Sequence, residues 1–176
     1  MLSCILAMVC GAFIIGADQL SKYLISSNME LYDSAGFIKG LIRIDYIHNT
    51  GGAWGMLSGY TWILLALTLI VMLICITLLI KSGVKSKLLF WAICLVLSGG
   101  IGNMIDRVFN DGKVIDFLHF EFWPQFPIFN IADIAVVIGA GLLILYFIID
   151  IVNEQKNKKA LKAAKESEDG QDNNDI

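Results

Sequence analysis

Charged side chains are scarce in this sequence. They make up 16% of its 176 residues, whereas a soluble domain carries about 25%. Hydrophobic residues reach 57%, and the mean hydropathy is +0.71. This balance excludes an ordinary soluble domain and predicts an integral membrane protein. The formal net charge of -3 gives no support to a nucleic-acid partner.

The residues that usually build metal centres and nucleophilic sites are also few. The two histidines, His48 and His119, stand alone without an HExxH arrangement. The four cysteines lie in apolar runs without CxxC spacing, which argues against a zinc site or a disulfide framework. No GxSxG motif is present. We therefore expect no metal and no cofactor, and activity that survives treatment with a chelator.

What the chain has in abundance is long apolar stretches with few charges, each close to the roughly 20 residues that span a bilayer. They predict four transmembrane helices, at about residues 2–24, 53–80, 88–105 and 127–149. The first run could be a cleavable signal peptide. However, no basic segment precedes it and no small-residue cleavage site closes it, so we interpret it as a helix that stays.

Two mixed segments separate these helices. From Ser26 to His48 charged residues alternate with short β-prone runs, which predicts strands lying at the membrane surface as a small platform that cradles a substrate. The small residues that follow, in Asn49-Thr50-Gly51-Gly52-Ala53-Trp54-Gly55, would let a ligand approach the backbone closely, and Trp54 suits the membrane interface.

Lysine placement predicts the orientation. Lys81, Lys85 and Lys87 surround the short turn after the second helix, and further lysines follow the fourth, so both regions should be cytoplasmic. Both termini then lie inside, and the loops 25–57 and 106–127 face outward. We expect one membrane domain at 1–153 and a charged, disordered cytoplasmic tail at 154–176.

With this orientation, the polar residues near the helix ends collect at the outer face. Asn103 and Asp106 lie three residues apart near the end of the third helix, and Asn130 and Asp133 repeat this spacing at the start of the fourth. A carboxylate beside hydrocarbon is costly to ionise, so it is expected to pair, to line a wet site or to carry chemistry. The full outer set is Asp18, Asn49, Asn103, Asp106, Asp116, Asn130 and Asp133.

Neighbouring carboxylates suggest one kind of chemistry. Two of them within hydrogen-bond reach cannot both ionise and share a proton instead. Such a pair supplies a base that activates water and an acid that protonates the departing amine, as peptide hydrolysis requires. Asp18 and Lys22, at i,i+4, could instead form a simple interfacial ion pair.

The motifs Asp18-Gln19-x-Ser21-Lys22, Asn49-Thr50-Gly51-x-Ala53-Trp54-Gly55, Gly100-x-Gly102-Asn103-x-x-Asp106-Arg107, Val114-x-Asp116-Phe117 and Phe129-Asn130-x-Ala132-Asp133 occur in this order. Over residues 10 to 150 the chain resembles the lipoprotein signal peptidase family, signal peptidase II. The resemblance implies an aspartic endopeptidase of the bacterial plasma membrane, and we expect it to work as a monomer. Its partners would be membrane lipid and prolipoproteins whose cysteine carries a diacylglyceryl group, and it would cut just before that cysteine.

Carried over by motif, the resemblance implies that Asp116 and Asp133 are the catalytic pair. The residues that would support them or bind the substrate are Asp18, Lys22, Asn49, Gly51, Asn103, Asp106, Arg107 and Asn130. Gly52 departs from the expected pattern, where a bulkier residue is usual.

A different pair is conceivable, because Asp106 also lies in a polar motif. The next residue is Arg107, and a cation beside Asp106 favours a permanently charged carboxylate, which carries protons poorly. Asp116 is flanked by apolar residues and Asp133 lies at the start of an apolar helix, so both settings are drier. We therefore expect Asp106 to be structural.

Three other classes remain as alternatives. A proton-coupled carrier would place its carboxylates throughout the membrane depth. A presenilin-like protease would need Gly-x-Gly-Asp, and this chain has Gly-Ile-Gly followed by Asn103. A small assembly subunit could use its Asp and Asn pairs to hold helices together.

Overall fold

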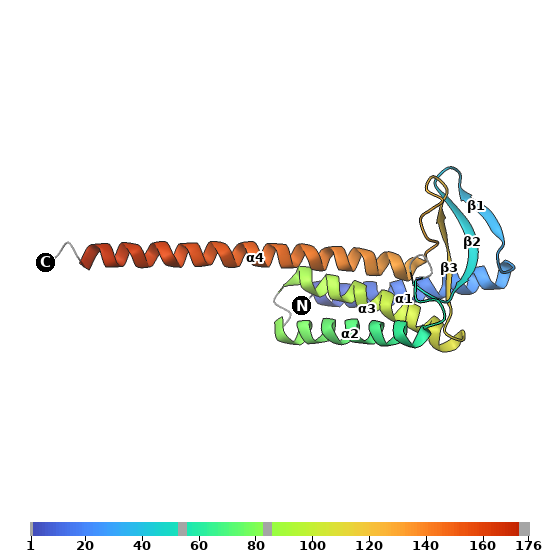
Figure 1. Cartoon of the computed structure of the whole chain (residues 1–176), viewed down its shortest axis with the longest axis horizontal. Coiled ribbons are helices and arrows are strands. Elements are labelled where there is room, and N and C mark those ends of the chain that lie inside the picture. Colours follow the sequence, from blue (N-terminus) through green and yellow to red (C-terminus); the bar gives the residue numbers. More distant parts are fainter. Residues whose placement is uncertain (1, 53–55, 83–85, 173–176) are drawn as a thin grey trace.

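The computed structural model describes residues 2–52, 56–82 and 86–172. Within these ranges four helices are long and apolar enough to cross a membrane. They are α1 (Leu2–Asn28), α2 (Thr61–Ser82), α3 (Lys87–Phe109) and α4 (Ile131–Asp172). A small antiparallel sheet lies at one end of the bundle, and the N-terminus and the long extension of α4 lie at the other (Figure 1). The predicted membrane fold of four helices with a small β platform is confirmed.

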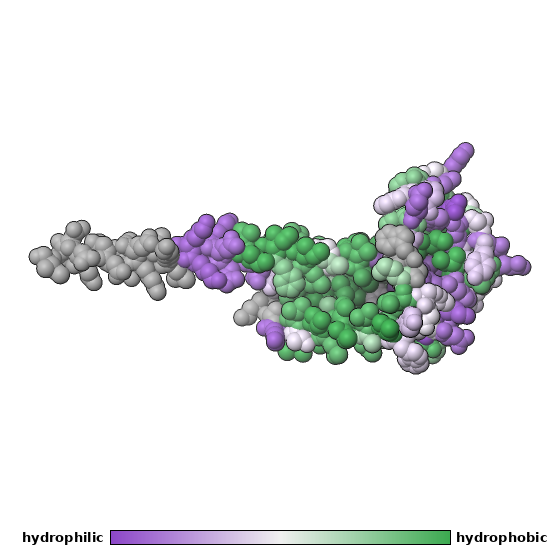
Figure 2. Space-filling view, viewed as in Figure 1, coloured by the Kyte–Doolittle hydropathy of each residue, from purple (hydrophilic) through white to green (hydrophobic). Residues whose placement is uncertain are grey.

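Apolar side chains cover the outside of the helix bundle. Figure 2 shows a hydrophobic surface over the helices, between a more polar end at the sheet and a polar stretch of α4 beyond the bundle. In the apolar spanning part of α2, 6% of the residues are buried inside the protein, whereas in that of α3 50% are buried. Lipid therefore surrounds most of α2, and α3 is the central helix that contacts the other three.

Small residues allow α3 and α4 to lie close together. A Cβ atom placed on Gly99 of α3 would lie 2.2 Å from the carbonyl oxygen of Ala132, and one on Gly139 of α4 would lie 2.8 Å from that of Ala92. Helices without a hydrophobic driving force between them rely on such close packing. These contacts fix the position of the α4 N-terminus against α3.

Gly99→Ala is expected to destabilise the protein by about 1–3 kcal/mol, the usual cost of an overpacked contact. The added methyl group would collide with backbone, which cannot rotate away as a flexible side chain can. Thermal unfolding in detergent micelles measures the effect. Gly16→Ala on α1 is the matched control, because nothing lies within 4 Å of its added Cβ; equal stability of the two variants would contradict the prediction.

The sheet has the order β1-β2-β3. β1 (Ser34–Ile38) and β2 (Ile42–Asn49) form an antiparallel hairpin, as the alternation in this segment predicts. β3 (Val114–Phe120) comes from the segment between α3 and α4 and pairs antiparallel with β2. The sheet thus brings Asp116 and Asn49, which are distant in sequence, to neighbouring strands.

Several helix boundaries differ from the prediction. α1 and α3 each extend about a turn further than expected, to Asn28 and Phe109. α2 begins at Thr61 rather than at Ala53, because turns with positive φ at Leu57 and Gly59 precede it. Trp54 lies outside the described residues.

The start and the end of α4 also differ. Pro127 and Ile128 are not helical: they lead into Phe129, which forms a bridge to Leu118 of β3, and α4 begins at Ile131. At its other end the helix continues to Asp172, well beyond 149. The division into a domain at 1–153 and a disordered tail stays a prediction.

Candidate active site

The two aspartates predicted as a pair come from different elements at the sheet end of the bundle. Asp116 lies in the middle of β3, is 1% exposed and pairs in register with Ile47 of β2. Asp133 is the third residue of α4. Flanking strand residues and the apolar body of α4 keep water away from much of each side chain.

The N-terminus of α4 holds Asp133 by a reciprocal cap. The Asn130 side-chain oxygen accepts the backbone N–H of Asp133 at 2.9 Å, while Asp133 Oδ2 accepts the backbone N–H of Asn130 at 3.1 Å. This is the capping-box geometry, with Asp in the position that Glu or Gln usually takes. The negative charge also lies at the helix end that favours it. The same bonds that begin the helix therefore orient Asp133.

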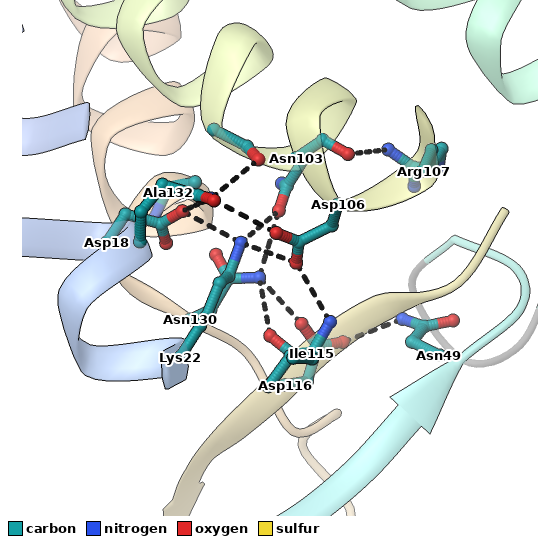
Figure 3. Close-up of polar contacts among 12 residues, drawn as sticks. Asp18, Lys22, Asn49, Asn103, Asp106, Arg107, Ile115, Asp116, Asn130 and Ala132 are labelled. Carbon is teal, nitrogen blue, oxygen red and sulfur yellow. Dashed lines mark hydrogen bonds and ion pairs between the residues drawn. The ribbon is translucent and has the colours of Figure 1, made fainter. Parts of the chain in front are cut away.

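Asn130 links the two aspartates. Its Nδ2 donates to Asp116 Oδ1 at 2.7 Å, so this one residue hydrogen bonds to both carboxylates. Asn49, at the end of β2, donates to the other oxygen of Asp116 at 2.8 Å. Figure 3 shows these amides converging on Asp116 from separate elements. Each acceptor oxygen of Asp116 thus has an amide donor.

A buried ion cluster lies beside the pair. Lys22 Nζ is 2.8 Å from Asp18 Oδ2 and 2.9 Å from Asp106 Oδ2, and all three side chains are nearly inaccessible. Asp18 Oδ1 accepts the backbone N–H of Ala132 at the start of α4. The cluster therefore joins α1, α3 and α4, which is more than the simple interfacial ion pair that i,i+4 spacing allows.

Lys22 also fixes the direction of the amides that reach the aspartates. Its ammonium group can only donate hydrogen bonds, and its third contact is Asn103 Oδ1 at 3.2 Å. The amide nitrogen of Asn103 must then point the other way, where it donates to Asp133 Oδ1 at 2.7 Å. Lys22 of α1 thus turns the Asn103 amide so that its N–H group points at the Asp133 carboxylate of α4.

Asp106 is paired differently from the expectation. Its neighbour in sequence, Arg107, does not form its ion pair; Lys22 does. Successive residues of a helix point about 100° apart, so adjacent side chains diverge. Asp106 Oδ2 also accepts the backbone N–H of Ile115 at 3.0 Å, which holds β3 immediately before Asp116.

Gln19 belongs to this network and was not among the predicted residues. Its side-chain nitrogen lies 3.1 Å from Asp18 Oδ2, 3.0 Å from Asp106 Oδ1 and 3.1 Å from the carbonyl oxygen of Gly102. Its place beside Asp18 in a polar run ending an apolar helix was the available signal. It adds a neutral donor to a cluster that contains two carboxylates and one ammonium group.

An open cavity of about 380 Å³ adjoins the aspartates. Asp116 and Asp133 lie on its wall together with Asn49, Gly51, Asn103 and Arg107, and the rest is mostly apolar, from Phe120, the segment 126–129 and one face of α4. Arg107 makes long contacts of 3.4 and 3.5 Å to the carbonyl oxygens of Asn103 and Gly51. Its Nε is buried without a hydrogen-bond partner among the described residues.

The electrostatics of Asp116 suit proton transfer. Burial, and then the nearby charge of Asp133, raise the pKa of Asp116 to about 7. The hydrogen bonds from Asn49 and Asn130 oppose this rise by favouring the ionised form. Asp116 can therefore hold or release a proton near neutral pH, which an ordinary aspartate cannot.

The predicted site residues line this cavity or belong to the ion cluster, except Asn130, which is buried and hydrogen bonds to both aspartates. In the part of the chain that the structure describes, no group of three or more His, Cys, Asp or Glu side chains could hold a metal ion. The arrangement offers two carboxylates, amide donors and a cation beside an apolar cavity. Such a set can activate water and protonate a leaving group.

Comparisons with known proteins agree on one family. The family model described as signal peptidase (SPase) II matches residues 10–149. Lipoprotein signal peptidase of Bacillus pumilus is 46% identical over 134 residues, covering 76% of this chain and 86% of that protein. The protein of the same name from Enterococcus faecalis is 41% identical over 139 residues, covering 79% and 85%.

A solved structure is also similar. It is a bacterial membrane enzyme determined by the in meso method at 2.3 Å resolution, with a TM-score of 0.78 and 35% sequence identity. The match covers 87% of this chain and 92% of that one.

Proposed function

Because this chain belongs to the signal peptidase II family of aspartic peptidases, we propose that it cleaves prolipoproteins whose cysteine carries a diacylglyceryl group, just before that cysteine. The observation that carries the proposal is that Asn130 hydrogen bonds to both Asp116 and Asp133, which lie together on the wall of a largely apolar cavity. Membrane lipid is the other partner, and the protein acts as a monomer.

The two aspartates divide the proton chemistry. Asp133 accepts hydrogen bonds on both oxygens, from Asn103 and from the Asn130 backbone, which favours its ionised form as the base that takes a proton from water. Asp116, with its raised pKa, carries the proton that reaches the departing amine. The attacking water adds to the scissile carbonyl carbon, and the C–N bond then breaks as the nitrogen is protonated.

The cavity also supports the choice of substrate. Its apolar wall suits acyl chains entering from the bilayer, since the cavity is lined by α4 residues such as Val137 and Ile138 that are exposed on the lipid-facing side. Arg107 and Gly51 are polar parts of the same wall. They are placed to hold the peptide backbone of the substrate beside the aspartates.

Turnover is expected to fall as pH rises above about 7, because Asp116 then loses the proton that it must donate. Because the pKa of Asp116 is raised, its protonated form persists up to about pH 7, whereas an ordinary aspartate loses its proton already in acidic solution. Steady-state kcat measured from mildly acidic to mildly basic pH tests this. Asn49→Ala removes a donor that favours ionised Asp116, so its alkaline limb should move to higher pH; a flat profile would contradict the assignment.

The proposed substrate class is tested by incubating the purified protein with a diacylglyceryl-modified prolipoprotein and, separately, with its unmodified precursor. Release of a signal peptide from the modified protein alone supports the proposal. Cleavage of both substrates, or of neither, would refute the stated specificity. Proton uptake into vesicles without cleavage would favour the carrier class instead.

We also infer that both termini are cytoplasmic and that the sheet and the cavity face the extracytoplasmic side of the plasma membrane. Lys81 and Lys87 flank the α2–α3 turn, and Lys156, Lys158 and Lys159 follow the apolar part of α4, all at the end of the bundle opposite the sheet. Lysines collect on the cytoplasmic side of membrane proteins.

Cysteine labelling checks this orientation. In a background without the native cysteines, Lys39→Cys in the β1–β2 turn should react with a membrane-impermeant thiol reagent in intact cells. Lys81→Cys at the end of α2 should react only after the membrane is permeabilised. Both lysines are exposed, so accessibility within the protein does not bias the comparison. The reverse pattern would overturn the orientation.

A further inference from the structure

His119 lies outside the candidate site, yet its side chain is only 7% exposed. It follows Asp116 by three residues on β3, and its ring makes contacts on both sides. Nδ1 is 2.5 Å from Asp45 Oδ2 on β2, and Nε2 is 3.2 Å from the carbonyl oxygen of Pro124. We call residues 121–130, which connect β3 to α4 and include Pro124, the aromatic loop.

These contacts restrict where the protons of the ring can lie. A carbonyl oxygen only accepts hydrogen bonds, and an ionised carboxylate does the same. Burial opposes the ionisation of Asp45, but hydrogen bonds from Ser34, His119 and Arg43 hold its pKa below its usual range. Nε2 therefore faces one acceptor, whereas Nδ1 faces both the Asp45 carboxylate and the donor Nη2 of Arg43. A ring that donates to both acceptors carries an N–H on each nitrogen, as an imidazolium does.

With the ring protonated, two positive groups, His119 and Arg43, share one negative group, Asp45. From β2, Arg43 lies with its Nη2 3.1 Å from His119 Nδ1 and works against a second proton on the ring, while its Nε donates to Asp45 at 2.7 Å. Asp45 offsets this repulsion by contacting both cations. β1 contributes the Ser34 hydroxyl, which donates to Asp45, and the aromatic loop contributes the neutral Pro124 carbonyl.

The aromatic loop forms part of the cavity wall. Phe126, Pro127, Ile128 and Phe129 line the cavity beside the aspartates. The rings of Phe126 and Phe129 pack on Phe120, the residue after His119. Their centroids lie 5.2 and 5.0 Å, respectively, from the centroid of the Phe120 ring. The bond from His119 to the loop backbone at Pro124 therefore adds a second tie between the apolar wall and the sheet, beside the Phe129–Leu118 bridge.

We propose that His119 is a positioning residue for substrate: as an imidazolium it ties the aromatic loop to β2 and holds the wall against which the lipid part of the substrate packs. The proposal rests on the proposed function for its substrate. It predicts that losing the ring charge weakens substrate binding while the proton chemistry at Asp116 and Asp133 continues. In kinetic terms, KM rises and kcat is kept.

The protonation of the ring is tested by ¹⁵N NMR of the imidazole side chains in detergent micelles at neutral pH. The chain has two histidines, so His48→Gln assigns the spectrum. His119 should show two protonated nitrogens. His48 should be neutral, because burial and the nearby Lys113 lower its pKa. A neutral His119 ring in the wild-type protein would overturn the proposal.

The effect on substrate is tested with His119→Gln and Asp45→Asn. Each should raise KM for the lipid-modified substrate about tenfold, the equivalent of one charge-assisted hydrogen bond, with kcat unchanged. His48→Gln should change neither. Asp45→Asn removes the anion that holds the second proton, so it should also shift the His119 resonances towards the neutral form, and it carries the test if His119→Gln does not fold. Unchanged KM in a folded variant, or a fall in kcat alone, would refute the role.

A third measurement separates this proposal from the proposed function. Hydrogen exchange of the Phe126 amide, which donates to the Trp123 carbonyl within the loop, should become faster in both variants than in the wild type. If the wild-type protein fails to cleave the modified substrate, the proposed function fails, whereas exchange and ring protonation still decide whether His119 anchors the loop. Unchanged exchange rates would show that it does not.

Discussion

Asp116→Asn and Asp133→Asn are each expected to lower turnover by about 10²–10⁴-fold, the range that general acid–base groups contribute, in a protein that still folds and binds substrate. Asparagine keeps the volume of aspartate but cannot take up or deliver a proton in the reaction. At Asp116 it also turns one NH₂ group towards the amide of Asn49 or Asn130, so a small loss of stability should accompany the loss of turnover.

Cleavage of a diacylglyceryl-modified prolipoprotein, measured beside thermal stability in detergent, checks this expectation. Asp111→Asn is the control: Asp111 is exposed in the α3–β3 turn with φ of 52°, where asparagine is tolerated, and its variant should be fully active. A stable, substrate-binding Asp106→Asn protein without turnover, beside an active Asp116→Asn protein, would show that the wrong pair has been proposed.

Lys22→Met is expected to be the most destabilising substitution in the ion cluster, by about 3–5 kcal/mol, because it leaves buried charges without their partner. Asp18 and Asp106 would face each other across the space that the ammonium group occupies now. Asn103 would also lose one of the two donors, Lys22 and Asn130, that set the direction of its amide. Asp106→Asn leaves Asp18 and Lys22 as an ion pair without net charge. Its loss of stability should therefore be smaller, and some turnover should remain.

Thermal unfolding in detergent should therefore rank the wild type above Asp106→Asn and Asp106→Asn above Lys22→Met. Lys39→Met, at an exposed lysine in the β1–β2 turn, controls for the loss of a positive charge and should match the wild type. If Lys22→Met unfolded at the wild-type temperature, the buried cluster would not be holding the three helices together.

Hydropathy predicted the number and order of the membrane helices well, because a spanning segment has to be apolar whatever it packs against. It failed at boundaries where apolar residues are not helical. Leu57 lies in a turn before α2, and Ile128 lies in an extended segment whose neighbour Phe129 pairs with β3. A count of apolar residues cannot distinguish these conformations from a helix.

The site was predicted in composition more than in connection. Motif order named residues that the structure brings together, and the dry flanks of Asp116 agree with its burial. Sequence adjacency misled for Asp106, whose cation is on α1 rather than next to it. Gln19 stood in the first motif but was given no role, because a neutral amide gives little signal until the carboxylates around it are located in space. Such contacts depend on how helices pack, which a single sequence does not reveal.

The ion cluster has a consequence for biogenesis. Asp18 and Lys22 lie on the same face of α1 and can neutralise each other as soon as that helix forms, long before the ribosome has made α3. The first helix can therefore enter the bilayer without a net charge at this depth. Asp106 and the backbone N–H of Ala132 are synthesised later and then complete the contacts of Lys22 and Asp18. Membrane insertion of the early part thus need not wait for its final neighbours, and the polar interior is assembled only when the last helix docks.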